Sequence, residues 1–224
     1  MRGVLHSEWT KLCSSPWCIF GLIVAALTAP MIAFANHPHG GCALWLHALY
    51  MVQAGIVIAA ASFFGQEYSR SCLRTTFLAV PSRIKAMAAK IIILLIAIIM
   101  TWMVSTALGW VVLRGKAHDL LAKTMPTMIS WLHMAVIAAS LTVIMKSHIA
   151  PIAVMGSLIL GLSQMLFSMI PQAKYLPDLA TMKLFTESQM GLFLDVWQGI
   201  AVQFGWAFVL GSIALVMTLR HDVR

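Results

Sequence analysis

Residues 65–90, GQEYSRSCLRTTFLAVPSRIKAMAAK, form the longest polar interruption in the first half of a very apolar sequence. Against the single acid Glu67, this stretch carries five basic residues: Arg70, Arg74, Arg83, Lys85 and Lys90. The sequence on either side is apolar over lengths that can cross a membrane. A basic, helix-prone segment between two membrane spans predicts a contact surface for a water-soluble partner.

Composition places the chain among membrane proteins. Of its 224 residues, 61% are hydrophobic and only 10% are charged, and the mean hydropathy is +0.90. Soluble domains carry about 25% charged residues. The net charge of +8 is better explained by orientation in an anionic membrane than by nucleic-acid binding, because the basic residues lie between apolar runs. The four cysteines are irregularly spaced, which disfavours a disulfide framework.

Six segments are apolar enough to span a bilayer. A helix needs about 20 apolar residues to cross a hydrocarbon core of about 30 Å, and only a helix satisfies its backbone polar groups there by itself. The predicted spans are residues 17–35, 44–64, 89–113, 125–145, 149–170 and 197–219. The sequence therefore predicts an all-α membrane protein with a single domain over residues 1–224.

The distribution of basic residues predicts that both termini are cytoplasmic. With the N-terminus inside, ten of the 15 Lys and Arg residues lie in cytoplasmic segments and five lie outside, as the positive-inside rule requires. The loop at 114–124 departs from the rule, because its three basic residues fall on the outer side.

Residues 1–16, MRGVLHSEWTKLCSSP, predict a short amphipathic helix on the membrane surface. The apolar residues at helical spacing are Leu5, Trp9 and Leu12. Glu8 and Lys11 lie elsewhere on the helical wheel and can form an ion pair at i, i+3. Pro16 then ends this helix before the first span.

Residues 171–196 are too polar to span the membrane. The segment begins with Pro171 and contains Pro177. It also carries many large apolar side chains: Leu179, Met182, Leu184, Phe185, Met190, Leu192, Phe193 and Leu194. These residues favour one or two short helices packed at the outer membrane surface over a solvated loop.

Motifs for several kinds of chemistry are missing from the sequence. It has no GxxxxGK[ST] phosphate loop, no HExxH and no GxSxG, so we expect neither an enzyme nor an ATPase. Ion-coupled transporters usually hold ionisable residues within their spans. Here the polar residues within the spans are His47, His133, Gln53, Gln164, Gln198 and Gln203. Energy for uphill transport would therefore come from a separate subunit.

Some of these polar residues have two interpretations. Four soft-metal ligands surround the first outer loop, namely His37, His39, Cys42 and His47, but their spacing matches no metal motif and favours an ordinary tight turn. His133 is more typical of an interhelical hydrogen bond than of a proton carrier. The four glutamines suit either a substrate path or helix packing. Small-residue pairs suited to close helix packing are Ser157 with Gly161 and Ala201 with Gly205.

The basic stretch itself divides into two parts. Residues 67–78 have helical potential, and Pro81 ends it. Ser82 suits the N-cap of a second helix that runs through Lys85 and Lys90 into the third span. A simple positive-inside anchor would explain the charges of the stretch but not its length or its internal break.

This stretch resembles the cytoplasmic loop of ABC-2 type transporter permeases, the membrane subunits of bacterial ABC exporters. The matching positions are Glu67, Arg70, Leu73, Arg74, Thr75, Leu78, Pro81, Arg83 and Lys90. The run SEWTKL at residues 7–12 is similar to the start of the family's N-terminal elbow helix. Ser71 and Cys72 depart from the family, which usually has Gly and Thr there.

The resemblance implies a mechanism. The loop at 65–88 would hold a coupling helix that docks on a separate ATP-binding subunit. The implied contact residues are Glu67, Tyr68, Arg70, Leu73, Arg74 and Thr75. Two permease copies would pair in the bacterial cytoplasmic membrane, with residues 1–16 as the elbow helix and 171–196 as a re-entrant segment over the exit path. A channel or assembly scaffold without an ATPase is the alternative, and the substrate cannot be inferred from such a fold.

Overall fold

The computed structural model describes residues 2–36, 42–69, 83–113, 120–186 and 193–220. Within these ranges the chain forms helices and turns and no strand. A first helix, α1 (Arg2–Ser14), precedes the membrane-spanning candidates. The predicted all-α class is therefore confirmed for the described part of the chain.

Six helices are long and apolar enough to cross a membrane, as predicted. They are α2 (Pro16–Ala35), α3 (Cys42–Ser69), α5 (Arg83–Val112), α6 (Leu120–Met145), the combined α7 (Ile149–Ser157), π-helical turn η1 (Leu158–Leu162) and α8 (Ser163–Met169), and α9 (Val196–Arg220). The helices α3 and α5 are longer than their predicted spans. Each extends by about a turn or more toward the segment that joins them.

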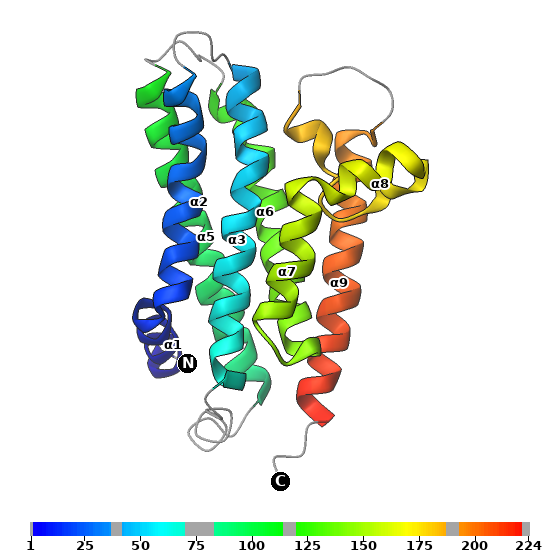
Figure 1. Ribbon diagram of the computed structural model, residues 1–224. Coiled ribbons are helices and arrows are strands. Elements are labelled where there is room, and N and C mark those ends of the chain that lie inside the picture. The colour runs from blue at the N-terminus through cyan, green and yellow to red at the C-terminus, as the bar shows by residue number, and fades with distance from the viewer. Residues whose placement is uncertain (1, 37–41, 70–82, 114–119, 187–192, 221–224) are drawn as a thin grey trace.

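The long helices run side by side as a bundle (Figure 1). Helix α1 and the C-terminal end of α9 lie at the same end of the bundle, which we call the α1 end. The described residues between α8 and α9, 170–186 and 193–195, lie at the opposite end. We call these residues the connector and the end that they cover the connector end.

The connector contains short helices packed onto the bundle, as predicted. They are the 3₁₀ helices η2 (Pro171–Tyr175) and η3 (Met182–Leu184). The apolar side chains buried among the described connector residues are Leu179, Met182, Leu184, Phe185 and Leu194. Burial of these side chains rules out a solvated loop for this part of the segment.

Glycines bring α2 and α3 into backbone contact. A Cβ atom on Gly21 would lie 2.6 Å from the backbone nitrogen of Ala59, and one on Gly55 would lie 2.7 Å from that of Ala25. Small residues permit this close approach in membrane bundles. The predicted small pairs lie elsewhere: nothing lies within 4 Å of a Cβ built on Gly161 or Gly205. Within the described residues, those two glycines therefore form no close helix crossing.

The second span was predicted to end at residue 64, directly before Gly65, which is too early. Helix α3 continues through Gly65 to Ser69. A Cβ on Gly65 would lie 2.3 Å from Cβ of His148, in the tight turn between α6 and α7. The glycine is needed for this close contact rather than for a helix end.

A π-helical turn interrupts the fifth span. Gly161 has a φ of 131° there, a conformation that favours glycine. The Ser163 hydroxyl oxygen lies 2.7 Å from the carbonyl oxygen of Leu158 and also within hydrogen-bond distance of Asp178, so these two acceptors share its single proton. Such turns are frequent at functional sites, and this one fixes Ser163 beneath the connector.

Candidate functional site

The predicted partner-contact residues are divided by the limits of the described chain. Glu67 and Tyr68 belong to the last turn of α3 rather than to a separate loop helix. The contact residues Arg70, Leu73, Arg74 and Thr75 lie outside the described residues. Helix α5 begins at Arg83, directly after Ser82, which the sequence predicted as its N-cap.

Two acids and two lysines meet at the α1 end. The Lys90 Nζ atom lies 2.7 Å from Oε1 of Glu67 and 4.0 Å from Oε2 of Glu8. The Lys11 Nζ atom lies 2.5 Å from Oε1 of Glu8 and 3.6 Å from Oε1 of Glu67. The side chains of Glu8 and Lys90 are each only 4% exposed. We call these four residues the α1-end cluster.

The charges of the α1-end cluster balance. Lys90 Nζ also lies over the rings of Phe63 and Phe64, 4.9 and 5.2 Å from their centroids, in cation–π contact. Burial lowers the pKa of Lys11, but hydrogen bonds and charges from Glu8 and Glu67 outweigh it, so the pKa is raised above its ordinary value. Both lysines are thus held by carboxylates.

The α1-end cluster closes the base of the segment between α3 and α5. Glu67 precedes the 70–82 stretch and Lys90 follows it. Their ion pair therefore joins the two ends of this segment, and Lys11 adds α1 to the same contact. Any force on the segment would act on α1, α3 and α5 together.

Helix α1 packs part of its predicted apolar stripe against the bundle and leaves part of it exposed. Leu12 is buried and Leu5 packs partly against the core, but Trp9 is 42% exposed. The buried acid Glu8 takes part in this packing instead, because Lys11 and Lys90 neutralise it. The predicted Glu8–Lys11 pair is confirmed.

A second buried carboxylate lies at the connector end. Asp178, in the turn between η2 and η3, is 0% exposed. Its Oδ2 atom accepts hydrogen bonds from the Tyr50 hydroxyl at 2.9 Å and from the Ser163 hydroxyl. Its Oδ1 atom has no hydrogen-bond partner among the residues that the structure describes. None of the ion pairs found in that part of the chain involves Asp178.

A hydrogen-bonded network of neutral side chains borders Asp178. The Ser130 hydroxyl accepts from Nε2 of Gln203 at 3.1 Å and of Gln53 at 3.4 Å, and lies 3.0 Å from the Thr181 hydroxyl. Gln203 also donates to the carbonyl of Pro177 at 3.0 Å. Helices α3, α6 and α9 therefore meet the connector here.

Together these residues form what we call the connector-end cluster: Tyr50, Gln53, Ser130, Ser163, Asp178, Thr181 and Gln203. The cluster lies within the bundle and not on its rim. Tyr50 comes eight residues after the start of α3, which is about 12 Å along a helix. The predicted spans contain no acidic residue in their interiors. The connector nevertheless places the acid Asp178 among them, inside the bundle.

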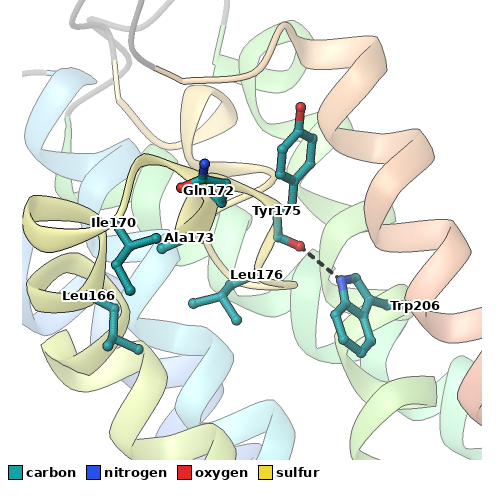
Figure 2. A pocket seen from close by; sticks show the side chains of 7 residues that line it. All are labelled: Leu166, Ile170, Gln172, Ala173, Tyr175, Leu176 and Trp206. Carbon is teal, nitrogen blue, oxygen red and sulfur yellow. Dashed lines mark hydrogen bonds between the residues drawn. The ribbon is translucent and has the colours of Figure 1, made fainter.

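On another face, the connector borders an apolar groove of about 290 Å³. Figure 2 shows its lining, which consists of Leu166, Ile170, Gln172, Ala173, Tyr175, Leu176 and Trp206. The Trp206 indole donates to the carbonyl of Tyr175 at 2.9 Å. Trp206 lies one turn from Gln203 on α9, so two adjacent turns of that helix hold the connector.

Only part of the connector-end cluster matches the sequence analysis. Of the four glutamines, Gln53 and Gln203 join this cluster, whereas Gln164 and Gln198 are exposed. His133 lies beside Gln203 and meets Phe204 edge-on, with ring centroids 5.8 Å apart, so it contacts α9, but its Nδ1 atom has no hydrogen-bond partner among the described residues. Asp178 was missed, although an acid within an otherwise apolar run was a usable signal.

The soft-metal ligands do not gather in the described part of the chain. His37 and His39 lie outside the described residues. His47 stacks on Tyr50, with ring centroids 6.3 Å apart. The described residues contain no group of three or more His, Cys, Asp or Glu side chains that could hold a metal ion.

No protein-family model matches the chain, and neither a curated protein nor a solved structure is significantly similar to it. The fold and its six apolar helices define the class of protein, a multi-pass helical membrane protein.

Proposed function

We propose that the chain is the membrane subunit of an ATP-driven exporter of the ABC-2 type, located in the bacterial cytoplasmic membrane. It works as one of two permease copies and is coupled to a separate ATP-binding subunit through residues 65–88. The observation that carries the proposal is the sequence pattern of this loop, placed between the second and third of six spans.

The α1-end cluster supports this proposal mechanically. A partner that pushes on residues 70–82 acts on a segment whose base is closed by the Glu67–Lys90 ion pair. The buried pair resists separation, so the push reaches α3 and α5 as one body. Lys11 extends the connection to α1, which then serves as the elbow helix of the proposed permease.

The opposite end of the bundle also fits the proposal. The short helices of the connector cover the end of the bundle opposite α1, where an exporter needs a cap over its exit path. Helix α1 and the C-terminal end of α9 lie at the same end of the bundle (Figure 1), as expected when both termini are cytoplasmic. The glycine faces at Gly161 and Gly205, open within the described chain, offer close approach to a second copy.

The test is affinity purification of the tagged full-length chain from its native membranes. We expect a subunit with a GxxxxGK[ST] phosphate loop to copurify with the wild type and to be lost with Arg70→Ala/Arg74→Ala. The matched control, Arg114→Ala/Lys116→Ala, removes the same charge from the loop on the other side and retains the subunit. Equal recovery with both double variants would contradict the loop assignment.

A membrane channel or assembly scaffold without an ATPase is the second candidate. The observation in its favour is Asp178, because ionisable groups inside membrane bundles often mark ion pathways. The same purification separates the two candidates. A channel or scaffold would yield no ATP-binding subunit with the wild type.

A further inference from the structure

We propose that Asp178 is a binding site for a small monovalent cation, a proton or a sodium ion, held beneath the connector. The site goes beyond the proposed export function. It does not depend on the ATP-binding subunit and can be tested on the chain alone.

The two carboxylate oxygens of Asp178 differ in their hydrogen bonds. Oδ2 of Asp178 accepts from Tyr50 and Ser163, whereas Oδ1 has no donor within the described part of the chain. The residue is 0% exposed, so bulk water does not solvate the free oxygen. A carboxylate buried without a counter-charge is strongly unfavourable, and a cation on Oδ1 removes this penalty.

The charged groups of the surrounding elements are engaged elsewhere. On the connector, Lys183 pairs with Asp195, and Lys174 lies over the Tyr175 ring at 5.4 Å. On α3, His47 stacks on Tyr50, and on α6, His133 lies beside Gln203. None of them forms an ion pair with Asp178 in the described chain. The Oε1 atom of Gln53 is likewise buried with no donor there.

The packing near Asp178 limits the size of a ligand. The backbone around Asp178 is tightly packed: a Cβ on Gly199 would lie 2.0 Å from the carbonyl oxygen of Ala180. Leu179 is completely buried beside it. Such packing disfavours an organic ligand beside Asp178.

The polar groups near Asp178 are of a kind that suits a cation. They are hydroxyls, amides and the Pro177 carbonyl. Oxygen ligands of this kind suit hard cations. The π-helical turn of the fifth span holds Ser163 in place, so one wall of the site is preformed.

In a purely structural role, Asp178 would only hold the connector to Tyr50 and Ser163 through its hydrogen bonds. The two roles differ in what Asp178→Asn does. The amide keeps the shape and an acceptor for the two hydroxyls but removes the negative charge. If the role is purely structural, the stability of neither the wild type nor Asp178→Asn depends on the cation. If Asp178 binds a cation, the stability of the wild type depends on it and that of Asp178→Asn does not.

The experiment measures the thermal unfolding midpoint of the purified full-length chain in detergent. Sodium chloride is titrated against choline chloride at constant ionic strength and pH, and pH is then varied at constant sodium. A ligand that binds only the folded state raises stability. At about one hundred times Kd, the expected rise is roughly 5 to 10 °C.

The expected result is a rise in the midpoint with sodium or with falling pH in the wild type, and its loss in Asp178→Asn. Asp195→Asn is the matched control, because Asp195 is an exposed acid of the same connector, and it should retain the wild-type dependence. A response to sodium identifies the ion. A response to pH alone, with an infrared carboxylic-acid band that Asp178→Asn removes, identifies the proton.

If the wild type and Asp178→Asn respond identically to both titrations, the proposal is wrong. Should Asp178→Asn fail to fold, the wild type and Asp195→Asn still decide it. A wild type without any sodium dependence and without a buried carboxylic-acid band would exclude both cations. Each of these outcomes leaves the purification test of the proposed export function unaffected.

Discussion

The two ends of the bundle bury carboxylates in different ways. At the α1 end, Glu8 and Glu67 face Lys11 and Lys90, so two negative charges meet two positive charges. At the connector end, Asp178 faces the hydroxyls of Tyr50 and Ser163. Among the described residues, each carboxylate of the first cluster faces an ammonium group, whereas the carboxylate of the second has no ion-pair partner.

This difference separates two uses of a buried acid. A balanced cluster resists change, because removing any one charge leaves another unpaired, so it suits a fixed joint between α1, α3 and α5. An unbalanced acid gains stability from a cation that comes and goes. We therefore propose that the α1 end transmits force and that the connector end binds an ion.

The largest effect is expected from Lys90→Met. This change leaves Glu67 and Glu8 buried against a single remaining lysine, and breaking a buried pair costs about 3–5 kcal/mol. The free energy of unfolding in mixed micelles measures it. Lys183→Met is the matched control, because its pair with Asp195 is exposed and is worth about 0–1 kcal/mol. Similar losses for both variants would show that the α1-end cluster is not a buried joint.

A double change sharpens the same point. In Glu67→Gln/Lys90→Met, the acid and its main counter-charge leave together, so less uncompensated charge remains. We expect the double variant to lose less stability than the sum of the two single losses, with a coupling energy of about 0.5–3 kcal/mol. Strictly additive losses, measured by the same unfolding titration, would mean that the two side chains do not interact.

A smaller effect is expected from Tyr50→Phe at the connector end. The change removes one donor from Oδ2 of Asp178, and hydrogen bonds to charged groups contribute about 1.5–3 kcal/mol. Ser212→Ala is the control, since that hydroxyl bonds to Phe208 of its own exposed helix face. A Tyr50→Phe protein as stable as the control would show that the hydrogen bond from Tyr50 to Asp178 does not stabilise the fold.

The smallest effect concerns Lys11 and pH. Its pKa in the folded chain is raised above the ordinary 10.5, so the folded state binds the proton more tightly than the unfolded state. The resulting stability is complete below pH 10.5 and is lost as the pH rises through the folded pKa. Lys11 is half-buried, so the loss is small. Thermal unfolding of wild type and Lys11→Met between pH 9 and 12 measures it, and parallel curves would contradict the expected shift.

The spans were predictable because the criterion is local. About 20 apolar residues in succession require a helix in lipid, and all six segments satisfy it. The start of α5 after Ser82 and the turn before α7 followed from similar local signals. Gly65 misled the prediction, because its role depends on His148, a residue far along the chain.

The two clusters were not predictable in the same way. Glu67 and Lys90 were both singled out, but their mutual ion pair depends on α3 and α5 packing side by side. Asp178 bonds to Tyr50, which is 128 residues away in sequence. No periodicity in the connector shows that a chain turn will carry its acid into the bundle. The contact residues at 70–75 remain a prediction from the family resemblance.

ATP hydrolysis in reconstituted vesicles tests the central claim most directly, namely that a separate subunit drives this chain through residues 65–88. The ATP-binding subunit that copurifies from native membranes is reconstituted with the wild type, with Arg74→Ala, or alone. We predict that the wild type raises the rate of ATP hydrolysis above that of the subunit alone and that Arg74→Ala abolishes the increase. Equal rates in all three preparations would contradict the account.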